Sequence, residues 1–224
     1  MRFFFALLFT VASSIIAQAA KTDKPNIIVI MADDLGYGDI GCYGAKPENL
    51  KTPNIDKLAA NGLRFTNGYC SASTCTPTRF SFLTGKYAFR QNNTGIAPPN
   101  GPAIIQPGVE TLPSLLKSAG YTTAVIGKWH LGHGDPAFFP TRHGFQSFYG
   151  HTAGCIDFFT MRYGIKPDWY RNEQPIDETG YATDLITEQA IQFLQQPRKD
   201  KPFFLYLSFK AVHYPFLPSK ENAG

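Results

Sequence analysis

Three apolar segments of this sequence are each followed, within a few residues, by side chains that can bind ions or move protons. Ligands of open parallel sheets bind beyond the carboxyl ends of the strands, where such side chains meet at one edge. If the three segments are parallel strands, two carboxylates, a lysine and two histidines lie close together. These five side chains are Asp33 and Asp34 after Asn26–Ala32, Lys128 and His130 after Tyr121–Gly127, and His213 after Phe203–Phe209.

The adjacent carboxylates Asp33 and Asp34 suit a hard divalent cation. Neighbouring carboxylates repel each other, and this repulsion is relieved by Ca²⁺ or Mg²⁺, which bind oxygen ligands. The alternative is a solvated turn before Gly36, because Asp-Asp-x-Gly is also common in turns. The pair alone favours the turn.

The segment Cys75-Thr76-Pro77-Thr78-Arg79 predicts an anion-binding helix start. Pro77 suits the first turn of a helix, which places Cys75 at the donor-rich N-terminus. Arg79 lies about one turn further on and on the same face. A thiol, helix N–H groups and a guanidinium together form a corner for an oxyanion, whereas a buried structural cysteine with a surface arginine is the alternative.

The surrounding pattern predicts an α/β fold, with a mainly parallel sheet flanked by helices on both faces. Strand-like runs alternate with helical patterns, as in parallel sheets built from strand–helix–strand units. We expect long irregular stretches over residues 90–108 and 132–181, and the second is a candidate binding surface. The expected strands are Asn26–Ala32, Gly62–Tyr69, Tyr121–Gly127 and Phe203–Phe209; the expected helices cover residues 52–62, 76–85, 112–120 and 186–194.

Composition excludes several classes of protein. The chain has 224 residues, of which 43% are hydrophobic and 14% aromatic, so it can form a core and is not a disordered chain. A formal charge of +4 is too small to indicate a nucleic-acid partner.

The first 19 residues are typical of a secretory signal peptide. Arg2 precedes an apolar run that is too short to span a bilayer, and Ala17-Gln18-Ala19 fits a signal-peptidase site. We therefore expect a secreted or periplasmic protein, with residues 1–19 as the signal and 20–224 as the catalytic part. No membrane association is expected once the signal is removed.

In these motifs the sequence resembles the sulfatase family, the formylglycine-dependent, arylsulfatase-like enzymes of the alkaline phosphatase superfamily. The segment CTPTRFSFLTGKY is the most specific part of the likeness, whereas HYPF alone is weak. The resemblance implies the alkaline-phosphatase-like fold and covers the N-terminal portion of the family. Its segments are Pro25–Asp34 with Gly36 and Gly38, Thr52–Phe65, Cys75–Tyr87, Gly127–Gly132 and His213–Phe216.

The resemblance implies a covalent mechanism centred on Cys75. A formylglycine-generating, or sulfatase-maturing, enzyme would oxidise this cysteine to formylglycine, and the hydrate of the aldehyde would form a covalent sulfo-formylglycine intermediate. The substrate would be an aryl or carbohydrate sulfate, either a small molecule or a glycan. Asp33, Asp34 and the modified Cys75 would be ligands of Ca²⁺.

The resemblance also implies roles for four basic residues. Arg79 would anchor the formylglycine, and Lys128 would contact both the sulfate and the hydrate. His130 would accept the proton when sulfate is expelled. His213 would face the ester oxygen and assist departure of the leaving group, so Lys128 and His213 would bind substrate.

The chain departs from the family in length, because family members are about twice as long. The other half carries an Asp-Asn pair of the calcium site and a further lysine, so we expect an incomplete calcium site and a domain that lacks the C-terminal part of the fold. Ca²⁺ prefers 6–8 oxygen ligands. Two alternatives stay open: a phosphodiester or phosphonate monoester hydrolase of the same superfamily, and a truncated, non-catalytic product.

Several residues of the irregular region have two interpretations. His133 is expected to be an ordinary polar loop residue, whereas His143 and His151 either line a substrate pocket or are ordinary polar loop residues. Trp169–Arg171 either stacks on a sugar or aryl ring or forms a surface loop.

Overall fold

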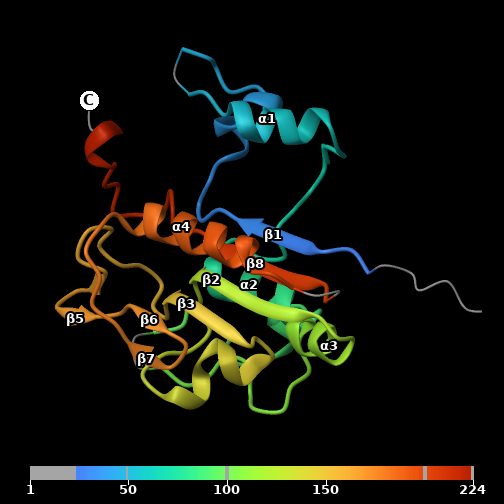
Figure 1. Ribbon diagram of the computed structural model, residues 1–224, viewed down its shortest axis with the longest axis vertical. Helices are drawn as coiled ribbons and strands as arrows, with labels where there is room; N and C mark the ends of the chain where they lie inside the picture. The colour runs from blue at the N-terminus through green and yellow to red at the C-terminus, as the bar shows by residue number, and fades with distance from the viewer. Residues whose placement is uncertain (1–23, 49, 99–100, 199–200, 223–224) are drawn as a thin grey trace, which may run out of the picture.

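A six-stranded mixed sheet is the centre of the computed structural model, which describes residues 24–48, 50–98, 101–198 and 201–222 (Figure 1). The strands lie in the order β1-β8-β2-β3-β6-β7, and β4 and β5 form a separate two-stranded hairpin. The strands are β1 (Ile27–Met31), β2 (Thr122–Lys128), β3 (Ser147–His151), β4 (Arg162–Tyr163), β5 (Lys166–Pro167), β6 (Tyr170–Arg171), β7 (Gln174–Pro175) and β8 (Phe203–Ser208).

The first four strands in this order are parallel, so their carboxyl ends meet at one edge of the sheet. β8 pairs with β1 on one side and with β2 on the other, and β2 pairs with β3. β6 pairs antiparallel with β3, and β7 pairs antiparallel with β6. The predicted α/β fold with a mainly parallel sheet is confirmed, and three of the four predicted strands are present as β1, β2 and β8.

Helices cover both faces of the sheet, as predicted. Along β2, Val125 packs into a core with α2 and α3, while Ala124 and Ile126 pack on the opposite face with α4. This alternation follows from the period of two in a β-strand. Figure 1 shows α4 on one side of the sheet and α2 on the other. The α-helices are α1 (Pro53–Ala60), α2 (Cys75–Thr84), α3 (Leu112–Ser118) and α4 (Ala182–Gln195).

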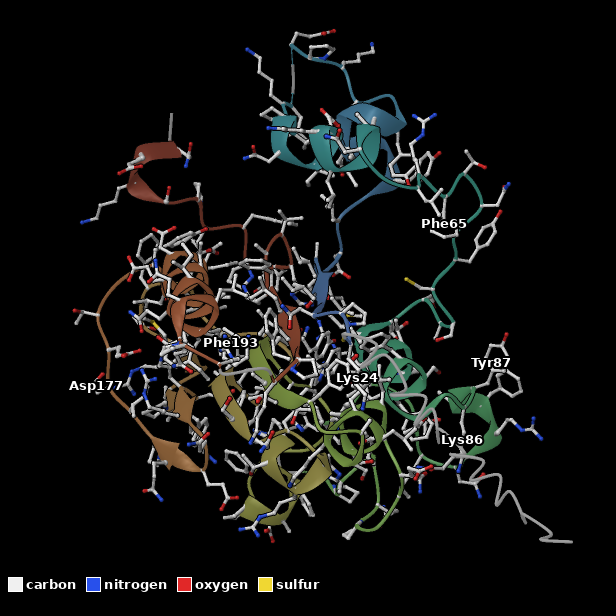
Figure 2. The ribbon with its side chains drawn as sticks, turned by 45° about the vertical axis from the view of Figure 1, so that its right-hand side comes forward. Lys24, Phe65, Lys86, Tyr87, Asp177 and Phe193 are labelled. Carbon is white, nitrogen blue, oxygen red and sulfur yellow. The ribbon has the colours of Figure 1, made fainter. Side chains whose placement is uncertain are left out.

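The segment around α1 stands away from the sheet (Figure 1), although α1 itself forms where predicted. None of the residues of α1 is buried. The strand predicted over Gly62–Tyr69 is wrong: this stretch is irregular, and Leu63 and Phe65 are 87% and 71% exposed. Figure 2 shows Phe65 well away from the sheet. The apolar residues here have no strand beside them to pair with among the described residues.

The region 132–181 is less irregular than predicted. It contains β3, which the sequence analysis missed because Ser147–His151 reads SFYGH rather than as an apolar run. It also contains four two-residue strands.

The 3₁₀ helices of the structure are η1 (Tyr37–Asp39), η2 (Gly41–Tyr43), η3 (Ala88–Arg90), η4 (Pro136–Phe138), η5 (Pro140–His143) and η6 (Lys220–Asn222).

The N-terminal signal prediction falls on residues 1–19, which lie outside the described residues. Over the residues that are described, no helix combines the length and the apolar run needed to cross a membrane.

Glycines allow the central strands to approach closely near their carboxyl ends. Gly127 has φ +110°, and a Cβ there would lie 1.9 Å from the carbonyl oxygen of Ser208 in β8. A Cβ at Gly150 in β3 would likewise lie 2.2 Å from the carbonyl oxygen of Gly127. Both contacts are to backbone, which cannot move aside without disrupting the ladder.

We predict that Gly127→Ala destabilises the protein by about 3–5 kcal/mol, since it combines a backbone clash with an unfavourable φ. Gly120→Ala is the matched control, because Gly120 also has a positive φ (+91°) but has open space around it. The control should cost only about 1–2 kcal/mol. Denaturant unfolding of both variants checks this, and equal losses would contradict the proposed clash.

Candidate active site

A buried ion cluster lies at the carboxyl edge of the sheet, where three of the predicted residues meet. The Nζ of Lys128, the last residue of β2, donates a hydrogen bond to Oδ2 of Asp33, which follows β1. Nη2 of Arg79 lies 3.6 Å from the same oxygen. All three residues are at most 4% exposed.

Arg79 reaches this cluster from α2 and is fixed by the neighbouring strands. Its Nη1 donates to the carbonyl oxygen of Lys128 (3.1 Å), to the hydroxyl of Tyr206 (3.1 Å) and to Oγ of Ser208. Its Nε is buried and has no hydrogen-bond partner among the described residues. The guanidinium is therefore held in one position while one of its donors stays available.

The cluster carries more positive than negative charge. Arg79 and Lys128 share the single carboxylate of Asp33, and burial of unbalanced charge is costly. The pKa of Lys128 is lowered, first by burial and then by Arg79, while Asp33 and Cys75 oppose the shift. The geometry favours an anion beside these two cations.

Cys75 lies next to this cluster, at the first position of α2 as predicted. Its Sγ lies 3.0 Å from Nδ1 of His130. The main chain at His130 has φ +55° and is held on both sides: Thr76 Oγ1 donates to its carbonyl oxygen (3.1 Å), and its N–H donates to the carbonyl of Thr152 (3.1 Å). The thiol and the imidazole thus face each other at fixed positions.

The surroundings of His130 favour its neutral imidazole. Burial lowers its pKa to about 3, with a further lowering by Lys128 and Arg79, partly opposed by the hydrogen bond with Ala97 and by Asp33. Its Nε2 lies 3.2 Å from the carbonyl oxygen of Ala97, which fixes the ring. A neutral imidazole beside Cys75 can accept a proton, and an anion in the site would favour its protonated form.

His213 and Asp34 form a second, more exposed pair. Nε2 of His213 lies 3.6 Å from Oδ2 of Asp34, whose side chain is 63% exposed. The main chain of His213 is tied to Lys210 through a 3.0 Å hydrogen bond to its carbonyl. This pair connects the ends of β1 and β8, so all seven predicted residues lie along one edge of the sheet.

A cavity of about 400 Å³ opens beside Cys75, His130 and His213. Its far wall comes from the chain after β3, where Gly154 lies so close to His130 that a Cβ would be 2.5 Å from the ring. His133 also lines the cavity, so the prediction of an ordinary loop residue is wrong. The other lining residues are Ile96, Ala97, Pro98, Gly132, Thr152, Ala153, Cys155 and Tyr163.

His143 and His151 do not line this cavity. His143 is stacked on Trp129 and His151 on Trp169, at ring-centroid distances of 5.7 Å and 6.3 Å. Both are buried, so desolvation lowers the pKa of His143 to about 4 and that of His151 well below its usual value. Of the two interpretations left open for these histidines, the structure favours a packing role.

The side chains that support the site were not predicted from the sequence. Tyr206 and Ser208 hold Arg79, and Asp168 holds the chain at Thr152–Ala153. A signal was present for the first two, because hydroxyls within the apolar run Phe203–Phe209 need buried polar partners. No local pattern marks Asp168.

The described residues do not form a complete cation site. Asp33 and Asp34 are oxygen donors, but Asp33 already balances two cations and Asp34 pairs with His213. Within the described ranges, no group of three or more His, Cys, Asp or Glu side chains is placed to hold a metal ion. Two carboxylates fall well short of the 6–8 oxygens that Ca²⁺ prefers.

Sequence comparison confirms the resemblance noted from the motifs. The sulfatase family profile matches residues 25–223. The chain is 36% identical to N-acetylgalactosamine-6-O-sulfatase of Bacteroides thetaiotaomicron, covering 91% of this chain and 51% of that protein. It is also 36% identical to human N-acetylgalactosamine-6-sulfatase, covering 89% and 42%. The chain spans about half the length of the curated relatives it matches.

Solved structures give the same result for the fold. The structure of Ps i-CgsB in complex with k-i-k-neocarrahexaose superposes with a TM-score of 0.81 at 33% identity, covering 88% of this chain and 47% of that one. BT4656 in complex with its substrate D-glucosamine-2-N,6-O-disulfate gives 0.71 at 35% identity, covering 87% and 36%. These similarities confirm the predicted sulfatase-type architecture.

We predict that acid destabilises the protein through its buried histidines, His130, His143 and His151. Between pH 6.5 and about 4.5, the unfolded chain gains a proton on each of them and the folded chain does not. The free energy of unfolding should therefore fall with decreasing pH, by up to about 1.4 kcal/mol per pH unit for each histidine. Urea unfolding across this range measures the slope.

The matched variant is His143→Phe, which keeps an aromatic ring against Trp129 and removes one of the three titrating histidines. This variant should reduce the dependence of the unfolding free energy on pH by up to about 1.4 kcal/mol per pH unit, the contribution of one histidine. A slope near zero in the unmodified chain over this range would contradict the neutral, buried state of these histidines.

Proposed function

This chain belongs to the sulfatase family, and from that premise we propose that it carries the nucleophile and anion-binding half of a hydrolase that cleaves sulfate esters. The observation that supports this most directly is the excess positive charge beside Cys75: Arg79 and Lys128 are both buried and share only Asp33. A sulfate ester carries negative charge on its sulfuryl oxygens. It would supply the anion that this arrangement favours.

The two cations are arranged to stabilise charge in the transition state. As the S–O bond breaks, negative charge spreads over the sulfuryl oxygens and the leaving oxygen. Because Arg79 is fixed by Tyr206 and Ser208, and Lys128 by its position at the end of β2, neither group needs to reorganise during the reaction. Such preorganised charge is commonly the largest contribution to catalysis.

Cys75 fits the position of a modified nucleophile. It is half-buried, lines the cavity and lies beside a neutral imidazole. A separate maturing enzyme would make formylglycine from Cys75. The hydrate of this aldehyde would supply one hydroxyl to attack sulfur and a second whose loss of a proton re-forms the aldehyde and expels sulfate. The residues present fit this group, since Lys128 and His130 both lie near the side chain of residue 75.

The histidines have separate roles in this proposal. His130, with Nδ1 toward residue 75, accepts the proton that is released when sulfate departs. His213 also lines the cavity and can donate a proton to the leaving oxygen. The carboxylate of Asp34 lies 3.6 Å from Nε2 of His213, at the same end of the site.

We propose that the substrate is a sulfated sugar. Relatives named for N-acetylgalactosamine 6-sulfate, and a neighbour solved with a disulfated glucosamine, support a carbohydrate ester. The cavity of about 400 Å³ is within the range of small-ligand sites and has both apolar and polar lining. Export, through the segment predicted over residues 1–19, is part of the same proposal.

We predict that, in a host with the maturing enzyme, the peptide containing Cys75 is about 18 Da lighter than its thiol form, as expected for conversion of CH₂SH to CHO. Mass spectrometry of the digested protein measures this. The peptide containing Cys155, which also lines the cavity, is the internal control and should keep its full mass.

The activity itself is tested with N-acetylgalactosamine 6-sulfate, an aryl sulfate and an aryl phosphodiester, using a protein that includes this chain and the rest of the family fold. The proposal is supported if the protein releases sulfate and the Cys75→Ala variant folds but releases none. An unmodified Cys75 in a competent host, or faster cleavage of the phosphodiester, would contradict it.

We also predict that the 224-residue chain binds Ca²⁺ only weakly, since Asp33 and Asp34 already pair with basic side chains and no three metal-binding side chains come together among the described residues. Calorimetric titration should give a dissociation constant no tighter than about 10⁻⁴ M, as at weak calcium sites. Stoichiometric, submicromolar binding would show that this chain alone completes the shell.

A further inference from the structure

A second cavity, of about 280 Å³, adjoins the first on the side away from β1. The two cavities share His133 and Tyr163 as lining residues. The remaining lining residues of the second cavity are Gly134, Ile165, Lys166, Pro167, Asp168 and Tyr170. None of these six lines the first cavity, so the second cavity is a separate space that meets the first at two side chains.

The boundary between the cavities is held rigidly by Asp168. This residue is 3% exposed, and its carboxylate accepts hydrogen bonds from the N–H of Thr152 (3.1 Å), the hydroxyl of Thr152 (2.7 Å) and the N–H of Ala153 (2.7 Å). Thr152 and Ala153 line the first cavity, whereas Asp168 lines the second. The distance between the two spaces is thus fixed by buried, charge-assisted hydrogen bonds.

The two shared side chains form a ridge between the cavities. The rings of His133 and Tyr163 pack edge to face, with centroids 6.2 Å apart. Nε2 of His133 is buried and has no partner among the described residues. A buried polar nitrogen without a partner is costly, and a hydroxyl-bearing ligand that crosses the ridge would satisfy it.

The outer wall of the second cavity has the chemistry of an anionic sugar site. Tyr163 and Tyr170 offer half-buried aromatic rings, which can pack against the apolar face of a sugar. Lys166 is exposed and adds a cation, while the carboxylate of Asp168 is occupied by its hydrogen bonds. The hairpin that carries Lys166 is closed by a hydrogen bond from Arg162 to the carbonyl of Ile165 (2.8 Å).

The geometry points to a subsite for the neighbouring sugar of an anionic oligosaccharide. This inference rests on the proposed function, which places the sulfated sugar in the first cavity. The chain would then continue over His133 and Tyr163, with the next sugar in the second cavity and its carboxylate or sulfate beside Lys166. The volume of the second cavity suits a single sugar ring rather than a longer segment.

The test compares two ligands, N-acetylgalactosamine 6-sulfate and the same sugar linked to glucuronic acid, titrated into the 224-residue chain with Cys75 as the thiol. Calorimetry should give about tenfold tighter binding of the disaccharide. In NMR spectra, the disaccharide alone should shift the amides of Gly134 and Lys166, because these residues line only the second cavity.

Three variants separate the cavities. Lys166→Ala should remove most of the gain from the second sugar, while Lys117→Ala, the same change on exposed α3, should keep it. Ile96→Ala, which affects only the first cavity, should weaken both ligands by the same factor. Equal affinities for the two ligands, or a full gain in Lys166→Ala, would overturn the subsite.

The monosaccharide result keeps this inference distinct from the proposed function. If the monosaccharide fails to shift the amides of Cys75 and His130, the proposed function is contradicted. If it shifts them and the second sugar adds nothing, the proposed function stands and only the subsite is lost.

Discussion

The carboxylate of Asp33 is the group on which the site depends, because it is the counterion of two buried cations. Arg79 and Lys128 come from α2 and β2, and Asp33 follows β1, so one carboxylate connects three elements of the fold. Buried charges are retained only when they are paired and hydrogen-bonded. One negative group against two positive ones leaves a net positive charge at the start of α2. Cys75 lies beside this charge, and the lowered pKa of His130 results first from burial and then from the neighbouring Lys128.

The sheet provides the rigidity that this balance needs. β2 and β8 are buried along nearly their whole length, and the close approach at Gly127 and Gly150 brings the ends of β8, β2 and β3 together. The chain after β3 then returns to His130 through Thr152 and Gly154. The apolar core thus determines the geometry of the polar edge, while the edge itself contributes charge and hydrogen bonds.

Much of the edge could be predicted from the sequence, because a parallel sheet gathers residues that follow different strands. That rule correctly places Asp33, Lys128 and His213 at one edge, and the proline and spacing of the Cys75–Arg79 segment correctly predict the start of α2. The apolar pattern does not reveal β3, whose sequence SFYGH mixes aromatic residues with serine, glycine and histidine. It also predicts a strand over Gly62–Tyr69, where no described strand lies beside the chain. Asp168 and His133 could not be placed, since their contacts depend on how the chain folds between residues 130 and 170.

The outer side of β1 has a practical consequence for anyone who produces this chain. Among the described strands, β1 pairs only with β8, and Ile28 and Ile30 are 46% and 60% exposed. A strand with open backbone groups and apolar side chains can add a strand from another molecule. Concentrated samples will therefore tend to self-associate along this edge. Low protein concentration, or a fusion partner that shields β1, would keep the material monodisperse.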